Sequence, residues 1–358
     1  MRRWIILIVA LCSGSISAQT TPTPIPLAVI DADNVTQLNA VWAVDFTALP
    51  PDITVESGWF TLSAAGDAIA VVRREGGLVI YDDTGAVVDT FALQGANGQP
   101  ATVLDARFAP DGRSIAAVQT DGEAFFVSVH TIGVAETLRL PFPVEYGLPV
   151  RVWFDAVAPY VWLEAMPFTE GAPQVVRLPL PDAEDTEIFA LPNAVELDSE
   201  ALVRIGRIPA PAAITATSAG VVKLWDLQTG LVTYRVQLES VPVFGRINEA
   251  TGTQLAWRDA QSDALNILDF VTGESQAVAV LGGEYIQALL LGATGDVVLG
   301  VHLGDDPSVA AWLTATGEQL DFGRYRACSR VPDMVQLSAD GTTLVIGCDT
   351  GLELWRVK

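Results

Sequence analysis

Few residues in this sequence are of types that could perform chemistry. The only two histidines, His130 and His302, lie far apart, neither has a serine nucleophile elbow nearby, and there is no Cys-x-x-Cys pair. Zinc sites need His and Cys ligands at suitable spacing, and nucleophilic catalysis needs a base beside its nucleophile. Spacing alone leaves a Ser-His-Asp arrangement open, but no glycine-rich phosphate-binding loop occurs. The sequence therefore predicts no catalytic, cofactor-binding or metal-binding residue, and no cofactor.

Acidic residues are abundant. Asp82-Asp83 and Asp305-Asp306 carry the oxygen ligands that Ca²⁺ prefers, but they lack the further spaced ligands of a dedicated loop, so solvated turns are the better interpretation. The whole chain holds 43 Asp+Glu against 20 Lys+Arg, a formal net charge of -23. Because nucleic-acid binding needs a basic surface that neutralises phosphates, this composition predicts no nucleic-acid partner.

The start of the chain has the pattern of an export signal. Arg2 and Arg3 precede an apolar run at 4–11 and a stretch of small residues that ends at Ala18. Such a pattern is typical of a secretory signal peptide, and the run is too short to span a membrane. We expect a signal peptide at 1–18, a Thr/Pro-rich linker at 19–29, and a secreted or cell-envelope location in a bacterium.

Cys12 leaves an alternative open. The start of the chain resembles bacterial lipoproteins, in which a Cys after the apolar run carries a lipid, although Leu11 stands where that family has Gly, Ala or Ser. Lipidation of Cys12 would tether the exported protein to a membrane surface. No stretch after residue 19 reaches 18 uninterrupted apolar residues, so no membrane span is expected.

A repeated unit runs through the rest of the chain. Glycine-centred turns recur, and the spacings between neighbouring copies are 43 to 46 residues. These turns contain Gly66, Gly112, Gly252, Gly295 and Gly341. The interval between Gly112 and Gly252 corresponds to three periods, so it hides two further copies, one near Pro159 and one near residue 208. A period of this length is typical of propellers and predicts seven copies.

Each copy reads as short strands joined by tight turns. Asp-Gly and Thr-Gly place glycine where a hairpin needs positive φ, and the short Val, Ile and Leu runs between them are typical of strands buried on both faces. We predict an all-β, seven-bladed β-propeller of four-stranded antiparallel sheets. The last copy lacks an outer strand because Trp355 is close to the C-terminus. We expect the N-terminal strand at 41–46 to close the ring beside residues 352–357.

These residues resemble the WD-repeat (WD40-like) propellers, in particular secreted bacterial versions. Leu224-Trp225-Asp226, Leu354-Trp355-Arg356 and the Asp-Gly turns carry the resemblance, which covers residues 30–358. The Gly-His dipeptide of that family is absent. The resemblance therefore supports the fold and says little about the subfamily.

The resemblance also implies a role for two cysteines. In WD-repeat proteins a His before the first strand hydrogen-bonds a Ser at the end of the second strand. Cys348 falls at the Ser position and Cys328 close to the His. A disulfide would replace this polar contact, and an oxidising compartment permits it. The alternative is two separate buried thiols.

The region from Pro141 to Pro211 departs most from the repeat. It contains many of the prolines, so its blades should be shorter or carry longer loops. It is also rich in aromatic residues, and exposed aromatics often anchor interfaces. We predict an interaction surface that includes Tyr146, Tyr160 and Phe168. The alternative for the neighbouring Trp153, Phe154 and Trp162 is packing between blades.

The leading functional hypothesis is a non-enzymatic, exported scaffold, monomeric, that binds a protein or peptide partner on one face of the ring. The alternative is a propeller enzyme or cofactor protein, either a metal-dependent hydrolase or lactonase or a quinone-binding type. The Thr-Gly-Glu turns at 272–274 and 316–318 faintly resemble quinone-binding repeats, which have a Trp after the turn. Here Trp225 and Trp312 precede their turns, which favours the WD type.

Overall fold

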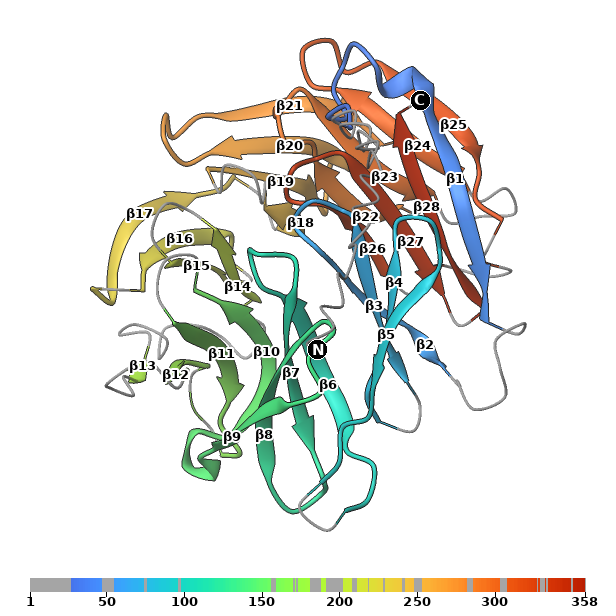
Figure 1. Cartoon of the computed structure of the whole chain (residues 1–358). Coiled ribbons are helices and arrows are strands. Elements are labelled where there is room, and N and C mark those ends of the chain that lie inside the picture. Colours follow the sequence, from blue (N-terminus) through green and yellow to red (C-terminus); the bar gives the residue numbers. More distant parts are fainter. Residues whose placement is uncertain are drawn as a thin grey trace, which may run out of the picture.

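The chain forms a ring of seven four-stranded antiparallel sheets, which we call blades 1 to 7 in chain order. The computed structural model describes residues 27–46 and 55–357 apart from internal gaps, of which the longest are 181–187, 191–201, 248–252 and 303–307. Figure 1 shows the sheets arranged around a common centre. The predicted fold class is confirmed.

In the first four blades every strand except β13 has five to eight residues. Blade 1 contains β2 (Val55–Leu62), β3 (Ala68–Arg73), β4 (Leu78–Asp82) and β5 (Val87–Phe91). Blade 2 contains β6 (Thr102–Phe108), β7 (Ser114–Thr120), β8 (Phe125–Thr131) and β9 (Thr137–Phe142). Blade 3 contains β10 (Leu148–Phe154), β11 (Tyr160–Met166), β12 (Gln174–Pro179) and β13 (Ile188–Ala190). Blade 4 contains β14 (Leu202–Arg207), β15 (Pro211–Ala216), β16 (Val221–Asp226) and β17 (Leu231–Gln237). The three-residue β13 lies in the proline-rich region, where a shortened blade was expected.

The last three blades complete the ring. Blade 5 contains β18 (Pro242–Ile247), β19 (Gln254–Asp259), β20 (Ala264–Asp269) and β21 (Ser275–Val280). Blade 6 contains β22 (Ile286–Leu291), β23 (Val297–His302), β24 (Ser308–Leu313) and β25 (Gln319–Arg324). Blade 7 contains β26 (Met334–Leu337), β27 (Thr343–Cys348), β28 (Gly351–Val357) and, from the other end of the chain, β1 (Leu38–Asp45). Two 3-10 turns, η1 (Val35–Gln37) and η3 (Val144–Tyr146), precede β1 and β10.

The strands form where short apolar runs meet turns that require glycine. In blade 2, β7 is buried along its centre, and it follows a turn in which Gly112 has φ +66°. The carboxylate of Asp111 accepts hydrogen bonds from the Arg113 and Ser114 amides and so holds this turn closed. Outer strands such as β5 and β21 are largely exposed, since nothing packs beyond them.

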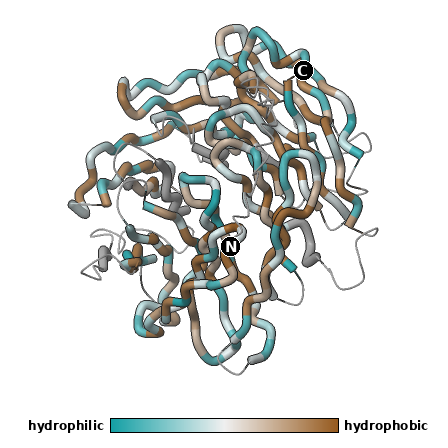
Figure 2. Tube along the Cα trace, in the orientation of Figure 1, coloured by the Kyte–Doolittle hydropathy of each residue, from teal (hydrophilic) through white to brown (hydrophobic). Residues whose placement is uncertain are grey.

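The core is divided among the joints between neighbouring blades. Seven clusters of buried apolar side chains each join two adjacent blades, and the seventh joins blade 7 to blade 1. Figure 2 shows hydrophobic stretches along the strands that form these joints. Trp162 and Trp225 fill the joint between blades 3 and 4. The ring is therefore held by sheet-to-sheet packing, as expected for stacked, twisted sheets.

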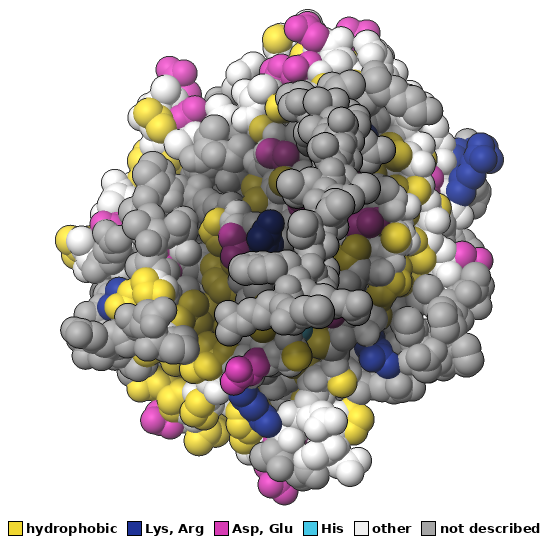
Figure 3. Space-filling view, in the orientation of Figure 1, with side chains coloured by type: hydrophobic (Ala, Val, Ile, Leu, Met, Phe, Trp, Pro, Cys, Tyr) yellow, Lys and Arg dark blue, Asp and Glu magenta, His cyan; other side chains and the backbone are white. Residues whose placement is uncertain are grey.

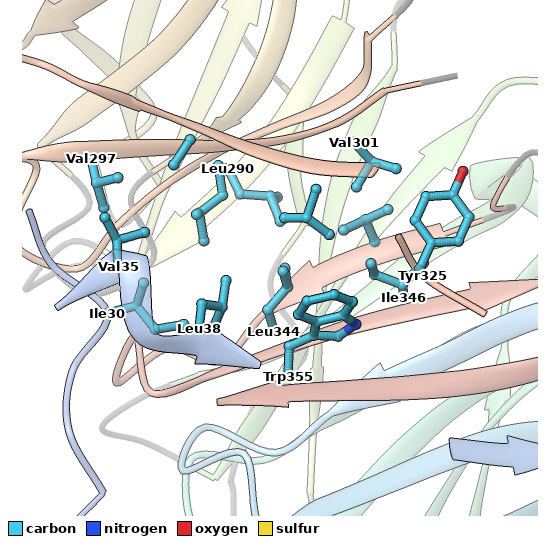
Figure 4. Close-up of a cluster of buried hydrophobic side chains, with 14 of the residues drawn as sticks. Ile30, Val35, Leu38, Leu290, Val297, Val301, Tyr325, Leu344, Ile346 and Trp355 are labelled. Atoms are coloured by element: carbon cyan, nitrogen blue, oxygen red, sulfur yellow. The ribbon is translucent and has the colours of Figure 1, made fainter. Parts of the chain in front are cut away.

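The N-terminal strand closes the ring as predicted, with slightly shifted bounds. β1 pairs antiparallel with β28 over the whole strand, from Leu38 opposite Val357 to Asp45 opposite Gly351. Ile30, Val35 and Leu38 are buried against Leu344 and Trp355, among other residues of blades 6 and 7 (Figure 4). Phe46, expected in the strand, follows it and donates its amide to the Thr350 carbonyl.

Candidate interaction surface

The ring has two faces, which differ in the connections they carry. On one face lie the glycine turns between the first and second strands and between the third and fourth strands, for example 63–67 and 269–274. We call this the glycine-turn face. The opposite face carries the turns between second and third strands and the segments between blades, for example 120–124 and 143–147. We call it the disulfide face, because it holds the bond described next.

Cys328 and Cys348 form a disulfide with their Cα atoms 5.7 Å apart. Cys348 ends β27, and Cys328 lies in the segment between β25 and β26. Both residues are buried, and nearby the Arg326 amide donates a hydrogen bond to Glu353 Oε2 at 2.6 Å. The two cysteines that the sequence predicts to pair therefore lie at disulfide distance.

Four aromatic rings form a continuous group on the disulfide face of blades 2 and 3. The Tyr146 ring meets the Phe142 ring edge-on at 6.1 Å, and the Phe168 ring stacks on Phe125 at 6.1 Å. Phe125 and Phe142 stand opposite each other on β8 and β9, so they link the two pairs. The group spans a β8–β9 edge, the 143–147 segment and the chain after β11.

Exposed aliphatic side chains extend this group. Val144 is 60% exposed and Met166 38%, and the Phe168 ring of the group itself is 61% exposed. We define the aromatic patch as Phe125, Phe142, Val144, Tyr146, Met166 and Phe168. In Figure 3 hydrophobic side chains gather over β8, β9 and β10, at the lower left, while acidic side chains are scattered around the periphery. Monomeric proteins seldom expose contiguous apolar surface of this kind without a use for it.

A close approach of two backbones shapes the patch. Gly147 has φ +96°, and a Cβ at this position would overlap the carbonyl oxygen of Met166. Only glycine fits both the conformation and the contact. The 143–147 segment therefore lies directly on the chain that leads from Met166 to Phe168, and the two halves of the patch touch.

The two blades that carry the patch are fixed to each other. Asp105 on β6 is fully buried and accepts a hydrogen bond from the Val152 amide of β10 at 3.0 Å. Burial raises the pKa of Asp105, and the nearby Arg107 guanidinium, at 3.4 Å, offsets part of that rise. A shared apolar cluster fills the rest of the joint. Tyr146 and Phe168 therefore project from a rigid base.

The structure brings together two of the three predicted surface residues and separates the third. Tyr146 and Phe168 belong to the patch. Tyr160 begins β11 at the opposite end of the strand from Met166, next to Pro179, with the Arg177 guanidinium 4.4 Å from the centre of its ring. It therefore lies on the glycine-turn face.

The packing interpretation holds for the neighbouring aromatics. Trp162 is 1% exposed, and its indole donates a hydrogen bond to Asp155 at 2.9 Å. Trp153 and Phe154 are half-buried and pack against the joints on either side of blade 3. Sequence reasoning missed the other four members of the patch, Phe125, Phe142, Val144 and Met166. The signal for Phe125 was available, because an Asp-Gly turn precedes the Phe125 strand and predicts a hairpin edge beside the 141–142 strand.

Charged side chains flank the patch. Glu123 and Glu145 are exposed on the turn before Phe125 and beside Tyr146. The guanidinium of Arg139 lies 3.6 Å from the centre of the Phe126 ring and 4.0 Å from Asp121. Phe126 and Arg139 face the other side of the β8–β9 sheet from Phe125 and Phe142, because side chains alternate along a strand.

His130 is buried at the joint between blades 1 and 2. Its Nε2 lies 3.1 Å from Asp89 Oδ2, its Nδ1 lies 3.2 Å from Thr137 Oγ1, and the Phe91 ring stacks on it at 3.9 Å. The Gly133 amide also donates to Asp89 Oδ2. The order carboxylate, imidazole, hydroxyl is found in hydrolases, but here the imidazole is covered by Phe91 and joins two blades.

We expect replacement of Asp89 by Asn to weaken this joint by ~1 kcal/mol at pH 6. Burial raises the pKa of Asp89, but the Gly133 amide and His130 outweigh burial and lower it overall. A carboxyl with a lowered folded-state pKa stabilises the fold above its unfolded pKa and loses that effect as pH falls through the lowered value. The deficit of D89N should therefore shrink as pH falls below about 3.8.

Urea unfolding of wild type and D89N at pH 6 and pH 3 measures this difference. E274Q, which changes an exposed side chain on the glycine-turn face, is the matched control and should track wild type at both values. A deficit of D89N that is the same at both pH values would contradict the prediction.

In the part of the chain that the structure describes, no three His, Cys, Asp or Glu side chains gather as metal ligands would. Asp82 accepts hydrogen bonds from the Thr84 amide and hydroxyl and from the Ala86 amide, so its carboxylate stabilises the turn at 82–86. Asp305-Asp306 and Cys12 lie outside that part. No helix within it is long and apolar enough to cross a bilayer.

Comparisons with known proteins identify the fold. The chain is similar to the β-propeller domain of Myceliophteria thermophila Cps50 (Swd1), with a TM-score of 0.61 and 15% identity over 90% of this chain and 100% of that one. It is also similar to a chain of the Mitotic Checkpoint Complex, with a TM-score of 0.59 and 14% identity over 89% and 96%. No protein-family model and no curated protein matches the sequence. The fold is therefore a WD40-type seven-bladed propeller, and at these identities nothing beyond the fold carries over.

Proposed function

We propose that this chain is an exported scaffold of the secreted bacterial propeller type, which binds a protein or peptide partner through the aromatic patch and has no catalytic role. Cleavage after Ala18 would release it, and lipidation of Cys12 would hold it at a membrane surface. The observation that carries the proposal is the aromatic patch, with its exposed apolar side chains on the disulfide face of blades 2 and 3. The patch and the N-terminal segment lie on opposite faces of the ring and on opposite sides of it. One of the similar structures is that of a complex, which agrees with a role in protein assembly.

The N-terminal segment meets the ring on the glycine-turn face of blades 6 and 7. The Ile30 amide donates to the Gly341 carbonyl at 2.9 Å, and the Ala32 amide donates to Asp296 Oδ2 at 3.2 Å. Both acceptors belong to turns between first and second strands. Ile30 is fully buried, which supports a domain boundary between the linker at 19–29 and the propeller at 30–358.

The patch lies across the ring on the other face. Figure 1 shows β1 at the upper right and β8 to β10 at the lower left. A lipid tether at Cys12 would leave the patch accessible, because the patch lies on the opposite face from Ile30. Cleavage after Ala18 would leave both faces accessible.

The proposal is tested by photo-crosslinking of the full chain produced in a bacterium with a cell envelope. We expect p-benzoylphenylalanine at position 168 to give one or a few discrete adducts with other proteins. The control is the same residue at position 271, which is 75% exposed on the glycine-turn face. Equal labelling from both positions, or none from 168, would contradict the proposal. The intact mass of the exported protein separates cleavage after Ala18 from lipidation of Cys12.

A further inference from the structure

We infer that the partner presents a cationic, apolar peptide segment, in which Arg or Lys side chains alternate with aliphatic or aromatic ones. This inference rests on the proposed function and specifies the chemistry of the partner at the same patch. Two properties of the patch support it, namely its exposed apolar side chains and the sign of the charges around them.

The exposed apolar side chains provide the apolar half of the contact. Phe168 is the most exposed ring of the patch, and Val144 and Met166 are exposed as well. Large side chains on a rigid base lose little conformational entropy when a partner covers them. Aliphatic or aromatic side chains of a peptide would remove these groups from water, which is favourable at ~25 cal/mol per Å².

The surrounding charges provide the cationic half. Glu123 and Glu145 are exposed at the rim. On the other side of the β8–β9 sheet, Arg139 stacks on Phe126 beside Asp121, and this contact shows how a guanidinium binds an aromatic ring next to a carboxylate. Guanidinium groups bind aromatic faces and carboxylates together. An incoming Arg beside Phe168 and Glu145 would repeat that arrangement.

Other occupants fit less well. Two copies of this chain that met through the patch would bring Glu123 and Glu145 of each copy toward those of the other, between molecules that each carry a formal charge of -23. An anionic lipid surface would be repelled for the same reason. A basic segment is attracted by both the rim and the whole protein, which also accelerates its association.

The test is selection of peptides from a phage-displayed random dodecamer library on the purified full chain. We expect the enriched peptides to carry net positive charge and at least one large apolar residue. One enriched peptide, synthesised with a fluorescent label, is then titrated by anisotropy. Its dissociation constant should rise at least about tenfold for F168A. For E123Q/E145Q it should rise about fivefold, and the effect should fade at 500 mM NaCl.

The matched control is E274Q/E318Q, which removes the same charge from exposed residues on the glycine-turn face and should bind like wild type. Unchanged thermal unfolding of every variant verifies the fold. Enrichment of acidic or uncharged peptides that still need Phe168 would overturn the inference and leave the proposed function standing. The inference would also be overturned if no peptide were enriched, if the protein self-associated through the patch, or if F168A bound the peptide as tightly as wild type. In those cases the crosslinking at position 168 decides separately whether the proposed function survives.

Discussion

A chain that lacks residues 27–45 should fail to form a cooperatively unfolding ring. The deletion removes the outer strand of blade 7 and with it the whole pairing of β1 with β28. It also removes Ile30, Val35 and Leu38 from the cluster between blades 6 and 7. Burial of three such side chains contributes about 5–9 kcal/mol, which is comparable to the entire stability of a typical domain. We expect loss of the sharp thermal transition and aggregation of the product.

The matched control is a chain that begins at Leu27, because it keeps every contact of β1. It should unfold at the same temperature as the complete chain. Leu38→Ala provides a milder variant that remains folded, and its free energy of unfolding should fall by about 3 kcal/mol. Calorimetry measures all three. A deletion variant that melts with the same midpoint and enthalpy as the control would show that β1 is dispensable.

Loss of the disulfide should have the second largest effect. The bond joins residues 20 positions apart, and the chain-entropy model gives ~3 kcal/mol for a loop of that length. We expect C328S/C348S to fold but to unfold at a lower urea concentration, with the free energy of unfolding reduced by that amount. The bond ties the segment before β26 to the end of β27, so the loosened part should be the first strand of blade 7.

Two comparisons make this prediction specific. Reductant should destabilise the wild-type protein to the level of C328S/C348S and should leave that variant unchanged. Alkylation of the native, unreduced protein should find neither Cys328 nor Cys348 reactive. Equal stability of the oxidised and reduced proteins would refute the predicted contribution of the bond.

The repeat could be predicted because its signals are local. Gly112 and Gly341 sit in hairpin turns that need positive φ, and the apolar runs after them become buried second strands. The copies near Pro159 and residue 208 were found from the period alone, and β10–β13 and β14–β17 stand there. The closing strand followed from a count, since a ring of four-stranded blades leaves β28 without an outer neighbour.

The candidate site could be predicted only in part, because it depends on contacts between distant segments. Tyr146 and Phe168 were identified as aromatic residues in a proline-rich region, yet Tyr160 shares that composition and lies on the other face. The difference comes from strand direction, since β11 carries Tyr160 to one end and Met166 to the other. Composition is the same at both ends of a strand, so it cannot distinguish them.

By itself the sequence determined the strands, the turns and the number of blades, because these depend on neighbouring residues and on a period. Only the tertiary structure decided which loops share a face, which four residues join Tyr146 and Phe168 in the patch, and that Ile30 docks on the opposite side of the ring. It also decided that Asp89 meets His130 and that Asp105 meets the Val152 amide. The physical reason is that such contacts form between blades. They depend on the register of strands far apart in the chain and on the closure of the ring.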